Sequence, residues 1–183
     1  MDYTDNIQLG IMKTKETQIK SGEECKDLIR FLGAYDAAIL GLAAQAILDK
    51  YGEDGYNTIK NAMYRKGELD AKELKEHGVT FKSFREFGMF FGSSLNGVVN
   101  SIISPKQKME IVSENEVVLT HTDCIRCREW GKLGLSNEMA MKLCDLYFGS
   151  FEAYLREIFP DIRVVKEKLI PRGDDVCRIV FRK

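Results

Sequence analysis

The spacing of hydrophobic positions divides the chain into a helical first half and a second half that mixes strands with helix. In the first half it predicts three helices, over residues 21–51, 53–78 and 80–103. Gly52 separates the first two, because glycine commonly follows the last turn of a helix. The third helix has the clearest period, with large apolar residues three or four positions apart at Phe81, Phe84, Phe87, Phe91, Leu95, Val98 and Ile102.

Beyond residue 105 the apolar positions begin to alternate, which is typical of strands that bury one face. Strands are predicted over residues 108–113, 116–122, 162–170 and 176–182, with a helix over 136–159 between the two pairs. The short connection within each pair implies an antiparallel hairpin. The predicted fold is therefore α+β: N-terminal helices followed by a four-stranded antiparallel sheet, made of two hairpins separated by a helix, with helices packed on one face.

The first predicted helix is unusual because nearly every face of its centre is apolar. The run from Ala37 to Leu48 is interrupted by Gln45, and it is shorter than the ~20 residues that a membrane-spanning helix needs. We therefore expect no membrane contact, and a helix buried either at the centre of the fold or by another subunit in a homodimer. Residues 1–20 lack such a period and are predicted to form a flexible arm outside a single domain of residues 21–183.

Composition and charge exclude some classes of function. The chain has 183 residues, of which 44% are hydrophobic and 30% charged, with a formal net charge of −1 and no basic stripe. Binding of nucleic acid needs a positive field to neutralise phosphates, so we expect none. The first residues are acidic and polar, with no apolar stretch after them, which indicates a cytoplasmic protein rather than an exported one.

The candidate chemistry lies in the cysteines of the last third. Cys124 and Cys127 form a C-x-x-C step in a predicted turn or short helix, and Cys144 and Cys177 follow singly. Thiolates in such a set could hold zinc or iron, with His121 as a further ligand. Alternatively, one thiol could be a nucleophile activated by a neighbouring base or cation. Free cysteines are also common as small core residues, so this third interpretation stays open.

Two acidic positions lie beside these cysteines in the sequence. Asp145 directly follows Cys144, but neighbouring residues of a helix point about 100° apart, so adjacency alone makes no catalytic pair. Asp174 and Asp175 lie in the loop between the last two strands, where carboxylates usually cap the turn. Both positions remain candidates for an acid or a base.

Several short motifs occur in the order found in one known family. They are Leu133-Gly134-Leu135, Cys144-Asp145 and Gly173-Asp174-Asp175-Val176-Cys177, preceded by Tyr51-Gly52-Glu53-Asp54-Gly55 and Tyr64-Arg65-Lys66-Gly67. Together with Cys127, this pattern resembles the L-2-amino-thiazoline-4-carboxylic acid hydrolase family over most of the chain after about residue 35. The resemblance implies hydrolytic opening of a cyclic, amidine-like C–N bond in a substrate that bears a carboxylate. It implies a site built from Cys127, Cys144, Asp145, Asp174 and Cys177.

A more distant resemblance is to the 4-vinyl reductase domain, a small-molecule-binding module of helices and an antiparallel sheet. It implies an alternative function, a ligand-binding or sensor domain without catalytic turnover, in which the cysteines could ligate a metal. The two resemblances agree on a small-molecule partner and differ on whether that molecule is transformed.

Overall fold

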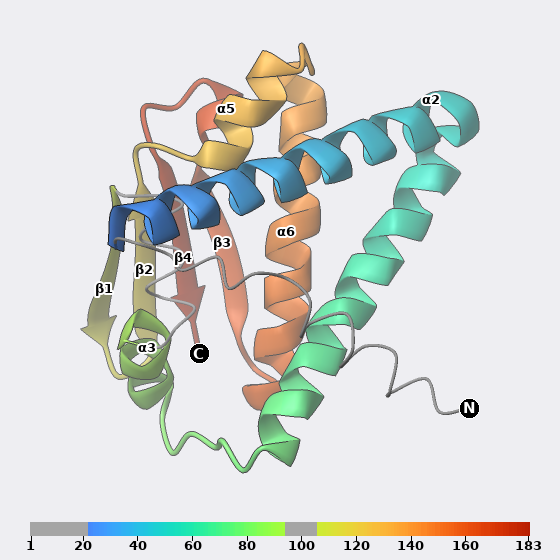
Figure 1. Cartoon of the computed structure of the whole chain (residues 1–183). Helices are drawn as coiled ribbons and strands as arrows, with labels where there is room; N and C mark the ends of the chain where they lie inside the picture. Colours follow the sequence, from blue (N-terminus) through green and yellow to red (C-terminus); the bar gives the residue numbers. More distant parts are fainter. Residues whose placement is uncertain (1–21, 94–105) are drawn as a thin grey trace, which may run out of the picture.

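The computed structural model describes residues 22–93 and 106–183, and its elements follow the predicted order (Figure 1). They are α2 (Gly22–Glu76), α3 (Phe84–Ser93), β1 (Gln107–Ser113), β2 (Glu116–His121), α5 (Ile125–Lys132), α6 (Asn137–Ile158), β3 (Arg163–Lys168), a 3-10 turn (Ile170–Arg172) and β4 (Cys177–Arg182). The predicted α+β fold is confirmed. The predicted arm of residues 1–20 and the part of the third predicted helix after residue 93 lie outside the described residues.

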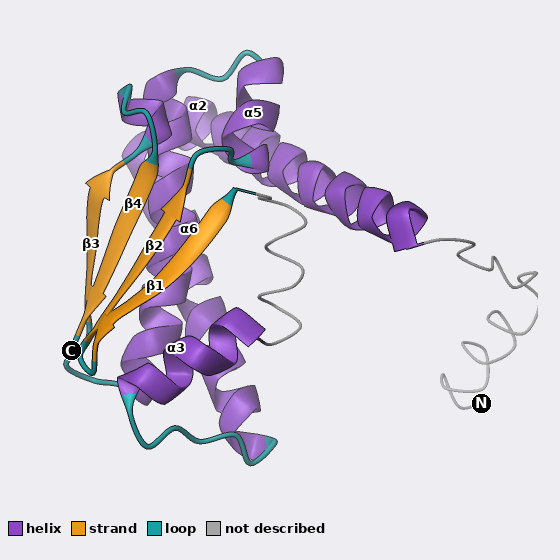
Figure 2. Cartoon of the chain, turned by 90° about the vertical axis from the view of Figure 1, so that its left-hand side faces the viewer, coloured by secondary structure: helices purple, strands orange, loops and turns teal. Residues whose placement is uncertain are grey.

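The four strands form one antiparallel sheet in the order β1-β2-β4-β3. Each hairpin pairs its own two strands, and β2 pairs with β4 to join the hairpins at the centre of the sheet. Helices α3 and α6 lie on one side of this sheet (Figure 2). The core between them consists of alternate strand residues and helical apolar side chains: Phe84, Phe87, Val117, Leu119, Leu155, Phe159, Ile179 and Phe181.

Helix α6 begins and ends on the signals that the sequence carries. The Ser136 hydroxyl accepts a hydrogen bond from the backbone N–H of Met139 at 3.1 Å, which caps the helix N-terminus. The helix ends at Ile158, two residues before Pro160, which lacks the N–H that a further turn would need. Its leucines at 143, 146 and 155 have no exposed surface, so α6 forms the centre of the helical layer.

Helix α2 is bent at Gly52, where φ is 61° and ψ is −147°, outside the helical range. Glycine reaches this region without the strain that a Cβ would cause. The bend divides α2 into a first arm, residues 22–51, and a second arm, residues 53–76, as the sequence predicts (Figure 1). The second arm lies so close to α6 that a Cβ on Gly67 would overlap the carbonyl oxygen of Ser150.

Of the two predictions for the first helix, burial at the centre of the fold is wrong. By length and composition, α2 is the one described helix that could cross a membrane. Only 17% of its most apolar 18-residue stretch is buried, so this stretch does not lie at the centre of the fold. The buried positions of the first arm are small residues, Ala37, Gly41 and Ala44. Phe31 and Ile39, on another side of the helix, are 64% and 51% exposed. The first arm therefore has one face on its own domain and one face uncovered.

Two element boundaries differ from the predicted ones, and a third segment takes one of its two predicted forms. Helix α3 begins at Phe84 rather than at residue 80, with the Ser83 hydroxyl accepting a hydrogen bond in its first turn. Strand β3 ends at Lys168, because the chain then enters the 3-10 turn that Gly173 closes at φ 98°. The segment after Cys124, predicted as a turn or short helix, is the helix α5.

Candidate functional site

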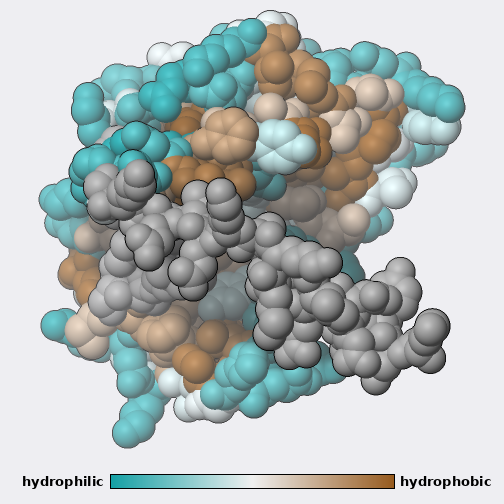
Figure 3. All heavy atoms as spheres, in the orientation of Figure 1, coloured by the Kyte–Doolittle hydropathy of each residue, from teal (hydrophilic) through white to brown (hydrophobic). Residues whose placement is uncertain are grey.

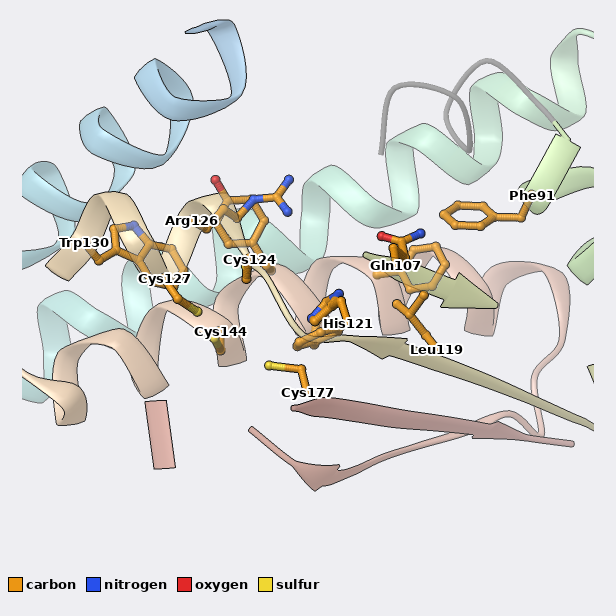
Figure 4. A pocket seen from close by; sticks show the side chains of 13 residues that line it. Phe91, Gln107, Leu119, His121, Cys124, Arg126, Cys127, Trp130, Cys144 and Cys177 are labelled. Carbon is orange, nitrogen blue, oxygen red and sulfur yellow. The ribbon is translucent and has the colours of Figure 1, made fainter. Parts of the chain in front are cut away.

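A cavity of about 180 Å³ lies where β2 and β4 meet helices α5 and α6 (Figure 4). Thiols make up much of its polar lining, and they come from Cys124, Cys127, Cys144 and Cys177. His121 and Arg126 contribute the ionisable nitrogens. Most of the remaining wall is aromatic, formed by Phe91, Trp130, Tyr147, Phe148 and Phe151. The fold thus brings the C-x-x-C pair together with two cysteines that are distant in the sequence, at one cavity.

His121 and Cys177 form a direct cross-strand pair at the edge of this cavity. They are opposite each other in the β2–β4 register, which places their Cβ atoms roughly 5 Å apart. His121 alternates with Leu119, a residue of the helix-facing core, so both side chains of the pair point to the helical side of the sheet. The Cys177 Sγ also accepts a hydrogen bond from the backbone N–H of Ile170 at 3.3 Å.

The other three thiols come from the helices above the sheet. Cys124 precedes α5 in an extended conformation, with φ −114° and ψ 113°. Cys127 follows in the first turn, three residues on, which puts the two side chains on the same side of the helix. Hydrogen bonds join Cys124 to Cys127, and Cys127 to Cys144 of α6. The three thiols therefore form a connected row along one wall of the cavity (Figure 4).

Two nitrogen atoms in the cavity wall lack a hydrogen-bond partner among the described residues. They are Nδ1 of His121 and Nε of Arg126, and both are buried. The guanidinium carbon of Arg126 lies 4.2 Å from the ring centroid of Tyr147, a cation–π distance. The Tyr147 hydroxyl in turn donates a hydrogen bond to Asp36 on α2 at 2.7 Å. Unpaired buried polar atoms cost about 1–3 kcal/mol each, so the two nitrogens are the natural contact points for a polar ligand.

The imidazole of His121 is held neutral at physiological pH. Burial lowers the pKa of His121, and the positive charge of Arg126 lowers it further, from 6.5 to about 4. The neutral ring has one N–H and one acceptor nitrogen, so it can accept a proton or a hydrogen bond. Because the charge of Arg126 contributes to this low pKa, a negative charge placed beside Arg126 would raise the pKa of His121.

The resolved pKa shifts keep three of the cavity thiols, those of Cys124, Cys127 and Cys177, protonated. The hydrogen bond to Cys127 and burial raise the pKa of Cys124 well above its ordinary value. The hydrogen bond from Cys124 lowers the pKa of Cys127, but its own bond to Cys144 and burial outweigh that effect and raise it. Burial raises the pKa of Cys177 to about 11, although the N–H of Ile170 acts in the opposite direction. A thiolate would therefore form here by proton transfer to a partner.

The four thiols do not surround a point at which a metal ion could lie. Within residues 22–93 and 106–183, no three side chains of histidine, cysteine, aspartate or glutamate are arranged to hold one. The zinc or iron centre that the cysteine spacing suggested does not fit this geometry.

The two acidic candidates, Asp145 and Asp174, do not line the cavity. Asp145 forms an ion pair with Lys166 of β3 and its side chain is 47% exposed. Asp174 Oδ2 accepts a hydrogen bond from the backbone N–H of Leu169 at 2.7 Å, which closes the loop before β4. The charge of Asp174 makes a minor contribution to the raised pKa of Cys177.

Two further residues of the cavity wall lie outside the set of site residues that the sequence predicts. Tyr147 follows Cys144 by three positions on α6, a spacing that places both side chains on the same wall of the cavity. Trp130 is the buried anchor that its apolar surroundings suggest, 1% exposed, and its indole N–H donates to the carbonyl oxygen of Ala37 at 2.9 Å. The same side chain also lines the cavity.

This fold and cavity define a small α+β domain with a thiol-lined pocket. Over residues 33–181 the sequence matches the family described as L-2-amino-thiazoline-4-carboxylic acid hydrolase. The chain belongs to this family, and the predicted resemblance is confirmed. A comparison with curated proteins gives no match.

Solved structures with the same fold have low sequence identity to this chain. A trafficking protein particle complex subunit 3 from Naegleria fowleri, covalently bound to palmitic acid, is similar with a TM-score of 0.55 and 11% identity, covering 81% of this chain and 95% of that chain. The phenol-responsive sensory domain of the transcription activator PoxR, with phenol, has a TM-score of 0.50 and 16% identity, covering 80% and 73%. These likenesses concern the fold alone.

Proposed function

We propose that the chain is a hydrolase that opens a ring C–N bond of a small, cyclic, amidine-like molecule bearing a carboxylate, and that the thiol-lined cavity is its active site. Membership of the hydrolase family supports the reaction class. The cavity volume of about 180 Å³ favours a substrate of one small ring over a large cofactor or an extended chain.

The observation that carries the proposal is the unpartnered pair of nitrogens, from Arg126 and His121, in the cavity wall. Arg126 Nε is a buried donor with no acceptor in the described part of the chain, and a carboxylate is the partner that a guanidinium binds best. His121 lies opposite Cys177 across two strands, with Nδ1 also free of a partner. A ligand held by Arg126 would therefore lie against a thiol and a neutral imidazole, the parts of a cysteine nucleophile and its base.

In the proposed reaction, the substrate's own charge activates the nucleophile. A carboxylate on Arg126 offsets the positive charge that helps to lower the pKa of His121, so the imidazole becomes basic enough to take the proton of Cys177. The Cys177 sulfur adds to the ring carbon, the π electron pair of its C=N bond passes to the ring nitrogen, and that nitrogen takes the proton held by His121. The lone pair of the exocyclic amino group then forms a new C=N bond as the ring C–N σ bond breaks, and the proton that the amino group loses passes to the leaving ring nitrogen. Water then adds to the same carbon and releases the Cys177 thiol.

A second function, ligand binding without turnover, is favoured by the protonated thiols. The pKa of Cys177 is raised to about 11, so no thiolate stands ready at neutral pH, as it does in many cysteine enzymes. The solved PoxR domain of similar fold is a phenol-responsive sensor. Both functions use the same cavity, and they differ in whether the Cys177 thiol is consumed and regenerated.

The experiment uses 2-amino-thiazoline-4-carboxylate and the fluorescence of Trp130, the single tryptophan of the chain, whose ring lines the cavity. The hydrolase proposal expects a fluorescence change on binding and ring opening by the wild type. Cys177→Ser should lower kcat by on the order of 100-fold or more while binding persists, and Arg126→Gln should weaken binding.

The matched control is Cys25→Ser, a cysteine outside the cavity lining, which should leave both readings unchanged. If the wild type and the variants bind the compound but none of them opens its ring, the sensor function replaces the hydrolase function. No fluorescence change and no turnover would remove this cavity as the site for that substrate class.

A further inference from the structure

The first arm of α2 carries an uncovered row of large apolar side chains, here called the apolar stripe. It consists of Leu28, Leu32, Tyr35, Ile39 and Leu42, flanked by Phe31, and these six side chains are between 46% and 64% exposed. The five positions recur at steps of four, three, four and three, which is the heptad spacing of helices that pack on another helix. Figure 3 shows hydrophobic side chains gathered along this part of the surface.

The opposite face of the same arm fixes the direction in which the stripe points. Ala37 and Gly41 lie against α5, where the Trp130 indole donates to the Ala37 carbonyl at 2.9 Å. A Cβ on Gly41 would lie 2.9 Å from the Trp130 ring, so the helix already touches its own domain through its smallest residues. The large residues are therefore held on the side of the helix that faces away from α5.

We propose that the apolar stripe is the interface of a homodimer, in which it packs against the stripe of a second copy of this chain. From Leu28 to Leu42 the row is about 21 Å long, enough for two full heptads of knobs-into-holes contacts. Covering six half-exposed side chains of roughly 200 Å² each would bury on the order of 600 Å² per copy, not far below the roughly 800 Å² of a standard interface. A self-complementary stripe also meets the requirement of a two-fold dimer.

The charges around the stripe disfavour a lipid surface as its partner. Between Glu23 and Asp49 the arm has five acidic residues and two basic ones, whereas helices that lie on anionic membranes are rich in lysine and arginine. The two basic residues, Lys26 and Arg30, already form ion pairs with acidic neighbours on the helix. Such paired charges of both signs beside an apolar row are typical of the flanks of a helix pair.

The sequence before α2 also lacks a segment that would match the stripe. Its aliphatic residues begin with Ile7, Leu9 and Ile11, which alternate rather than following a heptad. Leu95, Val98 and Ile102 have steps of three and four, but they span only about half the length of the row from Leu28 to Leu42. A second copy, in contrast, brings a row with the same length and spacing. Cys25 continues the seam by one step before Leu28, so its partly exposed thiol reports on whether the seam is covered.

The test measures the mass of the full chain by light scattering from about 1 to 100 µM, a range that spans typical dimer affinities. The wild type should have the mass of a dimer, and Ile39→Glu and Leu32→Glu should each be monomeric with unchanged circular dichroism. Leu69→Glu is the matched control, because Leu69 is 47% exposed on the second arm of the same helix, away from the stripe. This control should remain a dimer, and Cys25 should react with a thiol reagent several-fold faster in Ile39→Glu than in Leu69→Glu.

Three results would overturn the proposal. They are a wild type that is monomeric at 100 µM, a dimer that persists in both stripe variants, and a monomer that binds anionic phospholipid vesicles through Ile39.

Discussion

Acid should weaken the folded state through His121, because this side chain must stay neutral to remain buried. It is 8% exposed, and burial together with Arg126 lowers its pKa from 6.5 to about 4. Between these two pH values the unfolded chain binds a proton at this position and the folded chain does not. Stability is therefore complete above about pH 6.5 and falls as the pH decreases toward 4.

The size of this effect follows from the two pKa values. A decrease from 6.5 to about 4 corresponds to about 3 kcal/mol of unfolding free energy in total, of which about 2 kcal/mol is already lost at pH 5. Carboxylates also titrate near this range, so the wild type must be compared with His121→Gln, which cannot take the proton. Between pH 7 and pH 5, the wild type should lose about 2 kcal/mol more unfolding free energy than His121→Gln does. In urea unfolding this difference corresponds to about 1 M in the midpoint.

A third protein separates the two causes of the lowered pKa. Arg126→Gln removes the charge but keeps the burial, so its loss between pH 7 and pH 5 should lie between the other two. The reasoning fails if wild type and His121→Gln lose the same free energy on acidification. It also fails if the His121 ring titrates near pH 6.5 in an NMR spectrum of the folded protein, in which His77 serves as the exposed reference.

Three further predictions concern packing and thiol chemistry. Gly67→Ala should destabilise the fold by about 3 kcal/mol or more, because the new Cβ would overlap the backbone of Ser150; a melting temperature close to that of the wild type would contradict this. Trp130→Phe should cost about 2 kcal/mol in urea unfolding, through the lost bond to Ala37 and the small void left behind, and an unchanged midpoint would argue against it. Alkylation of Cys177, followed by mass spectrometry, should be slow at pH 7 and should accelerate up to about pH 11, because the raised pKa keeps the thiolate scarce. A rate that is already constant above pH 8 would refute that assignment.

Local signals predicted most of the fold because each element carries its own start or stop. Ser136 and Pro160 bound α6, and Gly52 marks the bend of α2. The alternating residues of β2 and β4 indicated which face of the sheet is buried. These features depend on neighbours within a few positions, and a single sequence contains that information.

The candidate site was predictable in its residue types and less so in its geometry. The spacing of the cysteines pointed to the last third, and four of them share one cavity. The pairing of His121 with Cys177 follows from the register of β2 and β4, which are separated in the sequence by α5, α6, β3 and the 3-10 turn. The same long-range geometry turns Asp145 toward Lys166 and away from the thiols, which adjacency to Cys144 does not reveal.

The exposed stripe shows a different limit of sequence reasoning. An apolar helix centre predicts burial, but it does not tell which face is buried within the domain. The answer depends on size: Ala37 and Gly41 fit beneath Trp130, while Ile39 does not face it. Residue volume on each face, rather than hydrophobicity alone, would have separated the two sides.

The bend at Gly52 also sets the helical phase of everything that follows it in α2. An α-helix turns by about 100° per residue, so one inserted or deleted residue at the bend would rotate Gly67 away from α6 by more than a quarter turn. Loops usually tolerate changes of length because they do not transmit orientation. The bend at Gly52 fixes the orientation of the second arm relative to the first. The number of residues in the bend is therefore as constrained as the identity of a core residue.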